Sequence, residues 1–329
     1  MGLTTTLRRI AFGALLALPL VGTPALAAKQ TDVAMQPYLG RWDMTLVTPE
    51  HSYASWLEIR EQKKGQLRVR LVSRWGHARW LPQASIVDQH LRFVSPKKDE
   101  ERPEDMVFEG SLSGDELKGT VNGLNGATWT WTAERAPALV RKHPPRWGEP
   151  IVLFDGKDLN GWAPVDATPN HWHAIDGQLA SLGSGADLRS NATFDDFKLH
   201  IEFNCAPGAN SGVYLRGRYE LQIEDDVAPE GPDRRTAAIY GYLAPVVAAP
   251  RTPGVWQSFD ITMIGRRVTV VLNGKTLINN QEIPGITGGA IDSHEGLPGP
   301  IVLQGGEPGQ VVFRNIVLTP ALPAEGEDR

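Results

Sequence analysis

The chain holds a single cysteine, Cys205, among its 329 residues. One cysteine excludes an internal disulfide framework and a cluster of thiolate metal ligands. Basic charge is also scarce: 33 Lys and Arg against 38 Asp and Glu give a net charge of −5. This argues against nucleic acid as a partner, because a polyphosphate backbone requires a large positive field. No apolar run approaches the roughly 20 residues that a membrane-spanning helix needs, so no transmembrane segment is predicted.

The amino terminus has the features of a signal peptide. Arg8 and Arg9 precede an apolar run over residues 10–21, and Ala25-Leu26-Ala27 is a small-x-small cleavage site. We therefore expect residues 1–27 to be removed and the mature chain to be secreted, periplasmic or extracellular. General secretion is favoured over the twin-arginine route, because the residues around the two arginines fit that signal poorly.

Glycine, proline and tryptophan are plentiful, with 34, 25 and 10 residues. Glycine and proline end regular elements, and aromatic rings fit pleated surfaces, so this composition predicts an all-β protein with many short strands. The hydrophobic fraction of 41% is that of an ordinary globular protein and excludes disorder. A mature chain of about 300 residues predicts two domains.

The domain boundary is predicted at residues 134–150, a proline-rich segment without a period of two or 3.6 that we interpret as a linker. Before it, residues 35–133 alternate apolar and polar side chains in short runs. A meander of about six to eight such strands exposes its edges unless it closes, so we expect a small lipocalin-like β-barrel or meander. After the linker we expect a jelly-roll domain over residues 151–320 and a flexible tail over residues 321–329.

Aromatic and cationic residues interleave in the N-terminal domain at Arg74-Trp75-Gly76-His77-Ala78-Arg79-Trp80. Flat rings stack on the apolar faces of sugars, and guanidinium groups hydrogen-bond hydroxyls. Trp75 and Trp80 are therefore candidates for contact with a carbohydrate, and burial in the core is the alternative.

Strict alternation in the second domain separates a core face from a polar face. Phe197, Leu199, Ile201 and Phe203 point one way, and the alternation continues over residues 213–224. If the two strands are neighbours, one sheet face gathers a set of polar side chains: Glu202, Tyr214, Arg216, Glu220 and Gln222. These are the donors and acceptors that a polyhydroxyl ligand requires, and an ordinary solvated face is the alternative.

Later alternating runs and an Asn273-Gly274 hairpin turn complete a two-sheet sandwich of jelly-roll type. Four ordered motifs of this domain match one family: Leu153-Phe154-Asp155-Gly156-Lys157-Asp158-Leu159-Asn160-Gly161-Trp162, Asn210-Ser211-Gly212-Val213-Tyr214-Leu215-Arg216, Tyr219-Glu220-Leu221-Gln222-Ile223-Glu224-Asp225 and Val312-Phe313-Arg314-Asn315-Ile316. On these motifs, residues 151–318 resemble the secreted, concanavalin-like 3-keto-glucoside 1,2-lyase / 3-keto-2-hydroxyglucal hydratase family, also called 3-keto-disaccharide hydrolases.

The resemblance implies cleavage of an oxidised, 3-keto glycoside. A ketone at carbon 3 acidifies the hydrogen on carbon 2, and the enolate formed by its removal expels the glycosidic oxygen from carbon 1. This β-elimination requires a general base, a group that stabilises the enolate oxygen, and a proton donor. We predict Glu220 as the base, with Arg216 and Tyr214 at the enolate oxygen. The predicted proton donor is Glu202 or His294.

Hydroxyl groups of the sugar are predicted to contact a further polar set: Asn210, Ser211, Gln222, Tyr240 and Gln304. One departure from the family concerns the penultimate strand, which in relatives ends in Leu-Gln-Asp-His-Gly but here reads Leu-Gln-Gly-Gly-Glu over residues 303–307. If the Asp-His pair assists catalysis in relatives, this chain has either lost that function or supplies it from His294-Glu295.

No cofactor is evident, since the sequence has no phosphate-binding loop, dinucleotide fingerprint or nucleophile elbow. A divalent cation is the exception: Glu224 and Asp225 could hold an ion such as calcium, and an acidic loop is the alternative. The same groups could also add water to the unsaturated product, which leaves lyase, hydratase and hydrolase activity open. A non-catalytic carbohydrate-binding or envelope-interaction protein remains the alternative function, and the N-terminal domain could dock an envelope partner such as the oxidoreductase that forms the ketone.

Overall fold

The computed structural model describes residues 35–63, 65–74, 76–183, 185–225, 231–249, 252–305 and 311–323. The predicted signal peptide and most of the predicted tail lie outside these residues. Within the described ranges, no helix is long and apolar enough to cross a membrane. The helical segments are the short 3-10 turns η1 (Gln36–Tyr38), η2 (Lys97–Asp99), η3 (Leu124–Gly126) and η4 (Pro232–Arg234).

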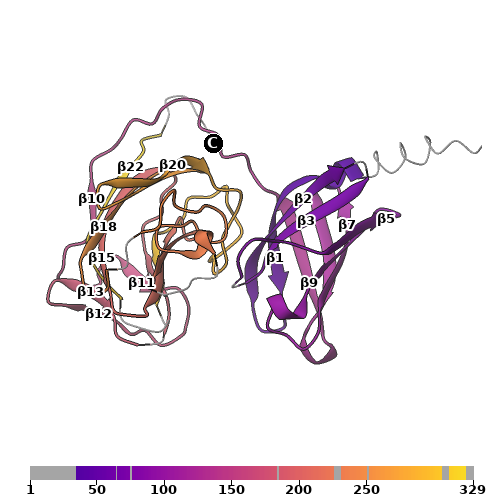
Figure 1. Cartoon of the computed structure of the whole chain (residues 1–329), viewed down its shortest axis with the longest axis horizontal. Helices are drawn as coiled ribbons and strands as arrows, with labels where there is room; N and C mark the ends of the chain where they lie inside the picture. Colours follow the sequence, from indigo (N-terminus) through magenta and orange to yellow (C-terminus); the bar gives the residue numbers. More distant parts are fainter. Residues whose placement is uncertain are drawn as a thin grey trace, which may run out of the picture.

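The described chain is all-β, as predicted, with a curled N-terminal sheet beside a two-sheet sandwich (Figure 1). The N-terminal sheet has nine antiparallel strands in the order β4-β3-β2-β1-β9-β8-β7-β6-β5. Their bounds are β1 (Gly40–Val47), β2 (Ser52–Lys63), β3 (Gln66–Val72), β4 (Arg79–Trp80), β5 (Gln83–Val87), β6 (His90–Ser95), β7 (Met106–Ser113), β8 (Glu116–Asn122) and β9 (Thr128–Arg135). The expected number of six to eight strands is too low, because the short strands β4 and β5 extend the two ends of the sheet. The pairings among described residues leave it open as a half-barrel.

The inside of the half-barrel is an apolar core that follows the alternation of the sequence. Trp42 and Met44 on β1, Leu57 on β2 and Trp131 on β9 are fully buried there. Side chains of the opposite parity lie on the outer face of the half-barrel, and the second domain covers this face along β1 and β2. Trp56 on that face belongs to the same buried cluster as the sandwich core, so β2 contributes side chains to two cores.

The sandwich consists of an eight-stranded and a five-stranded sheet. The eight-stranded sheet contains β10 (Ile151–Phe154), β12 (Trp172–Ile175), β13 (Gln178–Ser181), β15 (Phe197–Cys205), β18 (Gln257–Ile264), β19 (Arg267–Leu272), β20 (Lys275–Glu282) and β22 (Val311–Pro320). The five-stranded sheet has the order β11-β14-β21-β16-β17, with β11 (Trp162–Pro164), β14 (Leu188–Ser190), β16 (Asn210–Leu215), β17 (Tyr219–Glu224) and β21 (Val302–Leu303). The proline-rich segment runs from the end of β9 to β10.

Apolar side chains of both sheets meet in the sandwich core, where Phe203 stacks on Phe259 with ring centroids 4.7 Å apart. The buried residue Cys205 also belongs to this core. The predicted neighbourhood of residues 197–204 and 213–224 is wrong, because β15 pairs with β18 and β22, whereas β16 pairs with β17 and β21. The glycine-rich connection after β15 crosses from one sheet to the other.

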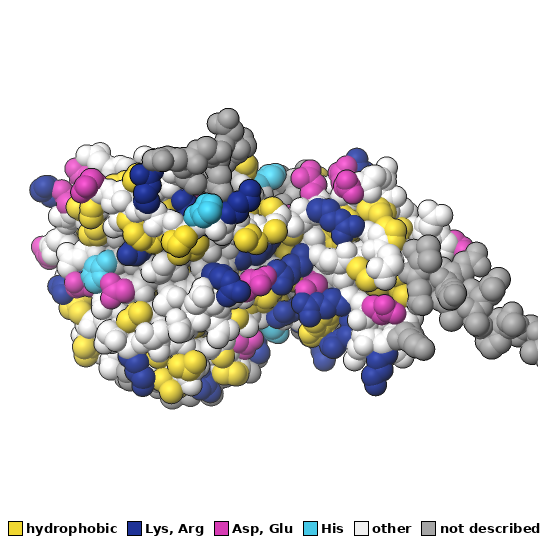
Figure 2. Space-filling view, turned by 90° about the horizontal axis from the view of Figure 1, so that it is seen from above, with side chains coloured by type: hydrophobic (Ala, Val, Ile, Leu, Met, Phe, Trp, Pro, Cys, Tyr) yellow, Lys and Arg dark blue, Asp and Glu magenta, His cyan; other side chains and the backbone are white. Residues whose placement is uncertain are grey.

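The two domains meet through apolar, polar and charged contacts. The ring of Trp56 packs edge-on against Tyr242 with centroids 5.8 Å apart. At the same junction Arg41 forms an ion pair with Glu282, with Nη1 and Oε1 separated by 2.5 Å. Charged side chains of both signs gather between the two bodies in the view from above (Figure 2). The N-terminal sheet is therefore docked on the sandwich and does not merely hang from the linker.

Candidate functional site

Gly212 lies within a polar patch on the outer face of the five-stranded sheet. β16 and β17 pair so that Gly212 is opposite Gln222, and Tyr214 is opposite Glu220. The odd-numbered side chains of these strands lie in the sandwich core, so the even-numbered ones lie on the outer face. A Cβ atom at position 212 would be only 2.7 Å from Oε1 of Glu220. Glycine at this position therefore leaves room for the carboxylate.

Glu220 and Tyr214 form the centre of this patch, and both are buried. The Tyr214 hydroxyl is within hydrogen-bonding reach of the Glu220 carboxylate and donates to the Gly288 carbonyl at 3.1 Å. Burial, followed by the charge of Glu220, raises the pKa of Tyr214 well above its usual range, so the phenol keeps its proton. The Glu220 backbone is fixed by its N–H, which donates to Oγ1 of Thr287 at 2.9 Å.

Three amide side chains surround Gly212 on the same face. Gln222 and Gln304 lie on either side of it, since the Gln304 N–H donates to the Gly212 carbonyl at 2.9 Å. Asn210 precedes it on β16. The side-chain oxygen of each amide is buried and has no hydrogen-bond partner within the described part of the chain. A buried polar atom without a partner costs about 1–3 kcal/mol, so three such oxygens on one face make the patch a candidate site for a ligand that brings hydroxyl or amide donors.

Sequence analysis missed two charged residues on this face. β14 pairs with β21 so that Asp187, next to its start, and Arg189 lie on the outer face. The charge of Asp187 contributes to the raised pKa of Tyr214, after burial and Glu220. The alternation around Leu188 was the available signal, but a strand of three residues is too short for a period of two to be recognised.

Glu202 is not part of this patch, contrary to the prediction. It lies on β15 in the other sheet, where Nε of Arg314 donates to its Oε2 at 2.6 Å and Nδ2 of Asn315 donates to its Oε1 at 2.7 Å. These hydrogen bonds, that of Asn315 first, lower the pKa of Glu202. The proposed role of proton donor is therefore wrong for Glu202, which is held as a carboxylate on the opposite side of the sandwich.

Arg216 also leaves the predicted face. It follows β16 in the left-handed conformation, with φ of 53°, and its buried side chain points to the rim of the sandwich. Nε donates to the Asp195 carbonyl at 2.6 Å, and Nη2 pairs with Asp196 at 3.4 Å and bonds the Gly265 carbonyl. The turn reverses the chain before the expected parity is completed, so Arg216 stabilises the fold and does not contact the Glu220 patch.

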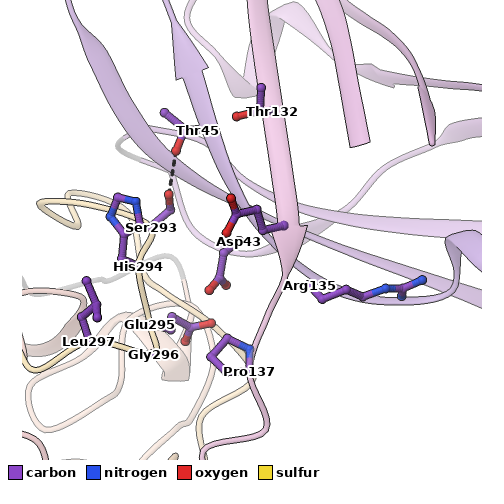
Figure 3. Close-up of a pocket in the computed structure, with 11 residues that line it drawn as sticks. Asp43, Thr45, Thr132, Arg135, Pro137, Ser293, His294, Glu295, Gly296 and Leu297 are labelled. Atoms are coloured by element: carbon purple, nitrogen blue, oxygen red, sulfur yellow. Dashed lines mark hydrogen bonds between the residues drawn. The ribbon is translucent and has the colours of Figure 1, made fainter. Parts of the chain in front are cut away.

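His294 lies at the domain junction, in a pocket of about 430 Å³ between β1, β9 and residues 293–297 (Figure 3). Its backbone N–H donates to Oδ1 of Asp292 at 2.8 Å. None of the described residues that line this pocket belongs to the Glu220 patch. The structure thus places His294 in a different pocket from the Glu220 patch, and its role as proton donor stays a prediction.

Glu295 is buried on the core side of β17, where the Tyr219 hydroxyl donates to it at 2.6 Å. Arg266 donates to both of its carboxylate oxygens, at 2.5 and 2.8 Å. Asp43 on β1 hydrogen-bonds the same carboxylate, and burial, followed by Glu295, raises the pKa of Asp43 to about 9. Asp43 thus keeps its proton at neutral pH and hydrogen-bonds Glu295 across the junction of the two domains.

The remaining predicted contacts are divided among several places. Tyr240 borders the patch, because its N–H donates to the Glu220 carbonyl at 3.0 Å. Ser211 has core parity, and its hydroxyl donates to the Gln304 carbonyl at 2.9 Å; it supports the patch from beneath. Trp80 lies on β4, and the guanidinium of Arg68 is 4.2 Å from its ring centroid. Trp75 lies outside the described residues.

The acidic pair predicted as a cation site has structural contacts. Oδ2 of Asp225 accepts the Gly208 N–H at 3.0 Å and closes the turn before β16. Oε2 of Glu224 accepts from Nε2 of Gln222 at 3.3 Å. Among the described residues, no group of three or more His, Cys, Asp or Glu side chains is arranged to hold a metal ion.

The chain is thus a β-sandwich protein that presents a carboxylate, a phenol and amides with unpartnered oxygens on one sheet face, a set of groups that suits a polyhydroxyl ligand. The comparison with family models defines it further: residues 149–319 match the 3-keto-alpha-glucoside-1,2-lyase-like domain, and the chain belongs to this family.

The chain is also similar to individual proteins. A 3-keto-disaccharide hydrolase of Bacteroides thetaiotaomicron is 35% identical over 75 residues, which are 20% of this chain and 26% of that protein. The match therefore spans about a quarter of the curated relative. Two solved structures from Parabacteroides distasonis, described as candidate glycosyl hydrolases, are 33% and 26% identical, with TM-scores of 0.46 and 0.42. They cover 51% and 52% of this chain and 82% and 98% of their own.

Proposed function

We propose that this protein cleaves 3-keto glycosides by β-elimination, with Glu220 as the general base. The observation that supports this most directly is the position of the Glu220 carboxylate: it is buried, lies over the bare backbone of Gly212, and is surrounded by amides whose oxygens lack partners. A sugar ring bound over Gly212 brings hydroxyl groups to those oxygens and its carbon 2 to the carboxylate.

The elimination proceeds in two steps. The carboxylate takes the proton from carbon 2, and the electron pair of that C–H bond moves to the carbon 3 ketone as an enolate. The enolate then re-forms the ketone, makes the double bond between carbons 1 and 2, and breaks the bond from carbon 1 to the glycosidic oxygen. The leaving oxygen takes up a proton. General base catalysis of this kind contributes about 10²- to 10⁴-fold to a rate.

Two donors on the same face suit the two remaining roles, which are to stabilise the enolate oxygen and to protonate the leaving oxygen. Arg189 offers a permanently charged guanidinium, which can stabilise the enolate oxygen in place of the displaced Arg216. Tyr214 keeps its proton because burial raises its pKa, and it is the proton donor that we assign to the leaving oxygen. Addition of water reverses these roles: the oxygen of water bonds carbon 1 and gives a proton to Tyr214, Glu220 returns its proton to carbon 2, and the free 3-keto sugar results.

The decisive experiment supplies the purified protein with a 3-keto-disaccharide and follows the conjugated enone by ultraviolet absorbance and mass. We expect turnover by the wild type and a loss of about 10²- to 10⁴-fold in kcat for Glu220→Gln. Glu202→Gln is the matched control, because this glutamate lies on the opposite side of the sandwich. It should retain kcat within about twofold.

A purely carbohydrate-binding protein is the second candidate, and the three unpartnered amide oxygens favour it as much as they favour an enzyme. The same experiment separates the two. Binding of the keto sugar by calorimetry without any product, across α- and β-linked substrates, would exclude the lyase and support the binding protein.

A further inference from the structure

The N-terminal sheet reaches the border of the Glu220 patch through the connection between β3 and β4. The carbonyl of Arg74 accepts the N–H of Gly289 at 2.6 Å. Further along the same connection, at His77, a Cβ atom added to Gly241 would be 2.7 Å from the Cβ atom of His77. Gly241 has φ of 70°, so both its conformation and this close approach require glycine. The two domains are therefore in backbone contact here.

Both contact points are next to residues that bond Tyr214 or the backbone of Glu220. The residue before Gly289 supplies the carbonyl that accepts the Tyr214 hydroxyl. The residue before Gly241 is Tyr240, whose N–H donates to the Glu220 carbonyl. The β3–β4 connection is thus separated from Tyr214 and Glu220 by one residue on each side.

Arg74 projects its side chain at this border. Its Nη1 donates to Nε2 of His51 at 2.8 Å, and its guanidinium lies 5.5 Å from the ring centroid of Tyr53. Asp166 follows β11, at the far edge of the five-stranded sheet. Its pKa is lowered mainly by hydrogen bonds from Thr168, and the charge of Arg74 adds to this effect. The Arg74 guanidinium therefore lies close enough to Asp166 for their charges to interact, at the edge of the sheet that carries the Glu220 patch.

We propose that Arg74, supplied by the N-terminal domain, forms the subsite for the leaving group of the glycoside. The inference rests on the proposed lyase function and names the part of the substrate that Arg74 contacts: a leaving group that is a second sugar or a comparable polyol. A ring held over Gly212 with carbon 2 at Glu220 directs the neighbouring glycosidic oxygen to the Tyr214 side, where Arg74 borders the patch. A guanidinium presents a planar fork of donors that matches two neighbouring hydroxyl groups.

The test measures steady-state kinetics of the full chain on two substrates, a 3-keto-disaccharide and methyl 3-keto-glucoside. We expect Arg74→Ala to raise KM for the disaccharide about tenfold, as loss of a charge-assisted hydrogen bond does, with kcat and the methyl glycoside unchanged. Arg74→Lys keeps the charge without the planar fork of donors, so its KM for the disaccharide should lie between those of the wild type and Arg74→Ala. Arg68→Ala is the control, because its guanidinium stacks on Trp80 of the same sheet.

The outcomes are distinct. Unchanged kinetics for both substrates, or an equal loss on both, would overturn the subsite, the latter because it indicates a structural role of Arg74. If the wild type converts neither substrate, the proposed lyase function fails, and calorimetry with the 3-keto-disaccharide decides about the subsite alone. Weaker binding by Arg74→Ala than by Arg68→Ala then supports it, and equal binding overturns it.

Discussion

At the scale of single residues, the site depends on a missing side chain. The Glu220 carboxylate occupies the space that a Cβ atom of residue 212 would fill, at 2.7 Å from Oε1 and 2.9 Å from Cγ. We therefore predict that Gly212→Ala displaces the carboxylate and lowers kcat about tenfold or more, since small misplacements of a catalytic group are costly. The flexible end of Glu220 can move, so the fold should survive, and the melting temperature should change little.

Gly183→Ala is the matched control for this substitution. Its Cβ atom would find only the His171 ring, 3.8 Å away, so it adds the same methyl group without displacing anything. Activity at the wild-type level for both variants would show that the close approach at residue 212 has no role in catalysis.

At the scale of elements, β2 is shared by two cores. Trp56 lies in the sandwich cluster, and its neighbour Leu57 lies in the half-barrel core. Replacing either by alanine removes a fully buried side chain, at a cost of about 3–5 kcal/mol for tryptophan and 2–5 kcal/mol for leucine. We predict that Trp56→Ala uncouples the domains and splits denaturant unfolding into two transitions. Leu57→Ala should lower the stability of the half-barrel alone while docking persists; a single unchanged transition in Trp56→Ala would contradict the shared role.

The same element scale explains which predictions from sequence succeeded. Parity within a strand is local, so the outward position of Tyr214, Glu220 and Gln222 followed from the alternation of residues 213–224. Sheet membership is not local: it depends on partners such as β18 and β22, which lie far along the chain. Glu202 was therefore assigned the right parity on the wrong sheet. Arg216 was misplaced because the sequence does not show at which residue β16 ends and the turn begins.

Short strands also limited what could be predicted from the sequence. Asp187 and Arg189 flank the centre of a three-residue strand, and their place on the outer face follows only from pairing with β21. The family resemblance, in contrast, rested on contiguous motifs and was confirmed by the match over residues 149–319. Local patterns and motifs were thus predictable, whereas the convergence of distant segments on one patch was not.

At the scale of the whole molecule, docking of the two domains is linked to pH through Asp43. An aspartate ionises near 3.8 in an unfolded chain, but burial beside Glu295 raises the pKa of Asp43 to about 9 in the folded protein. The folded state therefore binds a proton that the unfolded state releases between these two values. The resulting stabilisation is complete below about pH 4, declines as pH rises, and is lost above about pH 9.

Asp43→Asn tests this linkage, because the amide can donate to Glu295 as the protonated carboxyl does but cannot ionise. We predict that the melting temperature of the variant, relative to the wild type, increases steadily from pH 5 to pH 9 in scanning calorimetry. Glu134→Gln is the control: this exposed residue lines the same pocket and pairs with Asp43 across β1 and β9, and its removal should leave the slope unchanged. Glu295 and Arg266 are the two charged groups that shift the pKa of Asp43, and both are unchanged in the two variants. An identical pH slope in Asp43→Asn and the wild type would show that Asp43 does not carry the proton that holds the domains together.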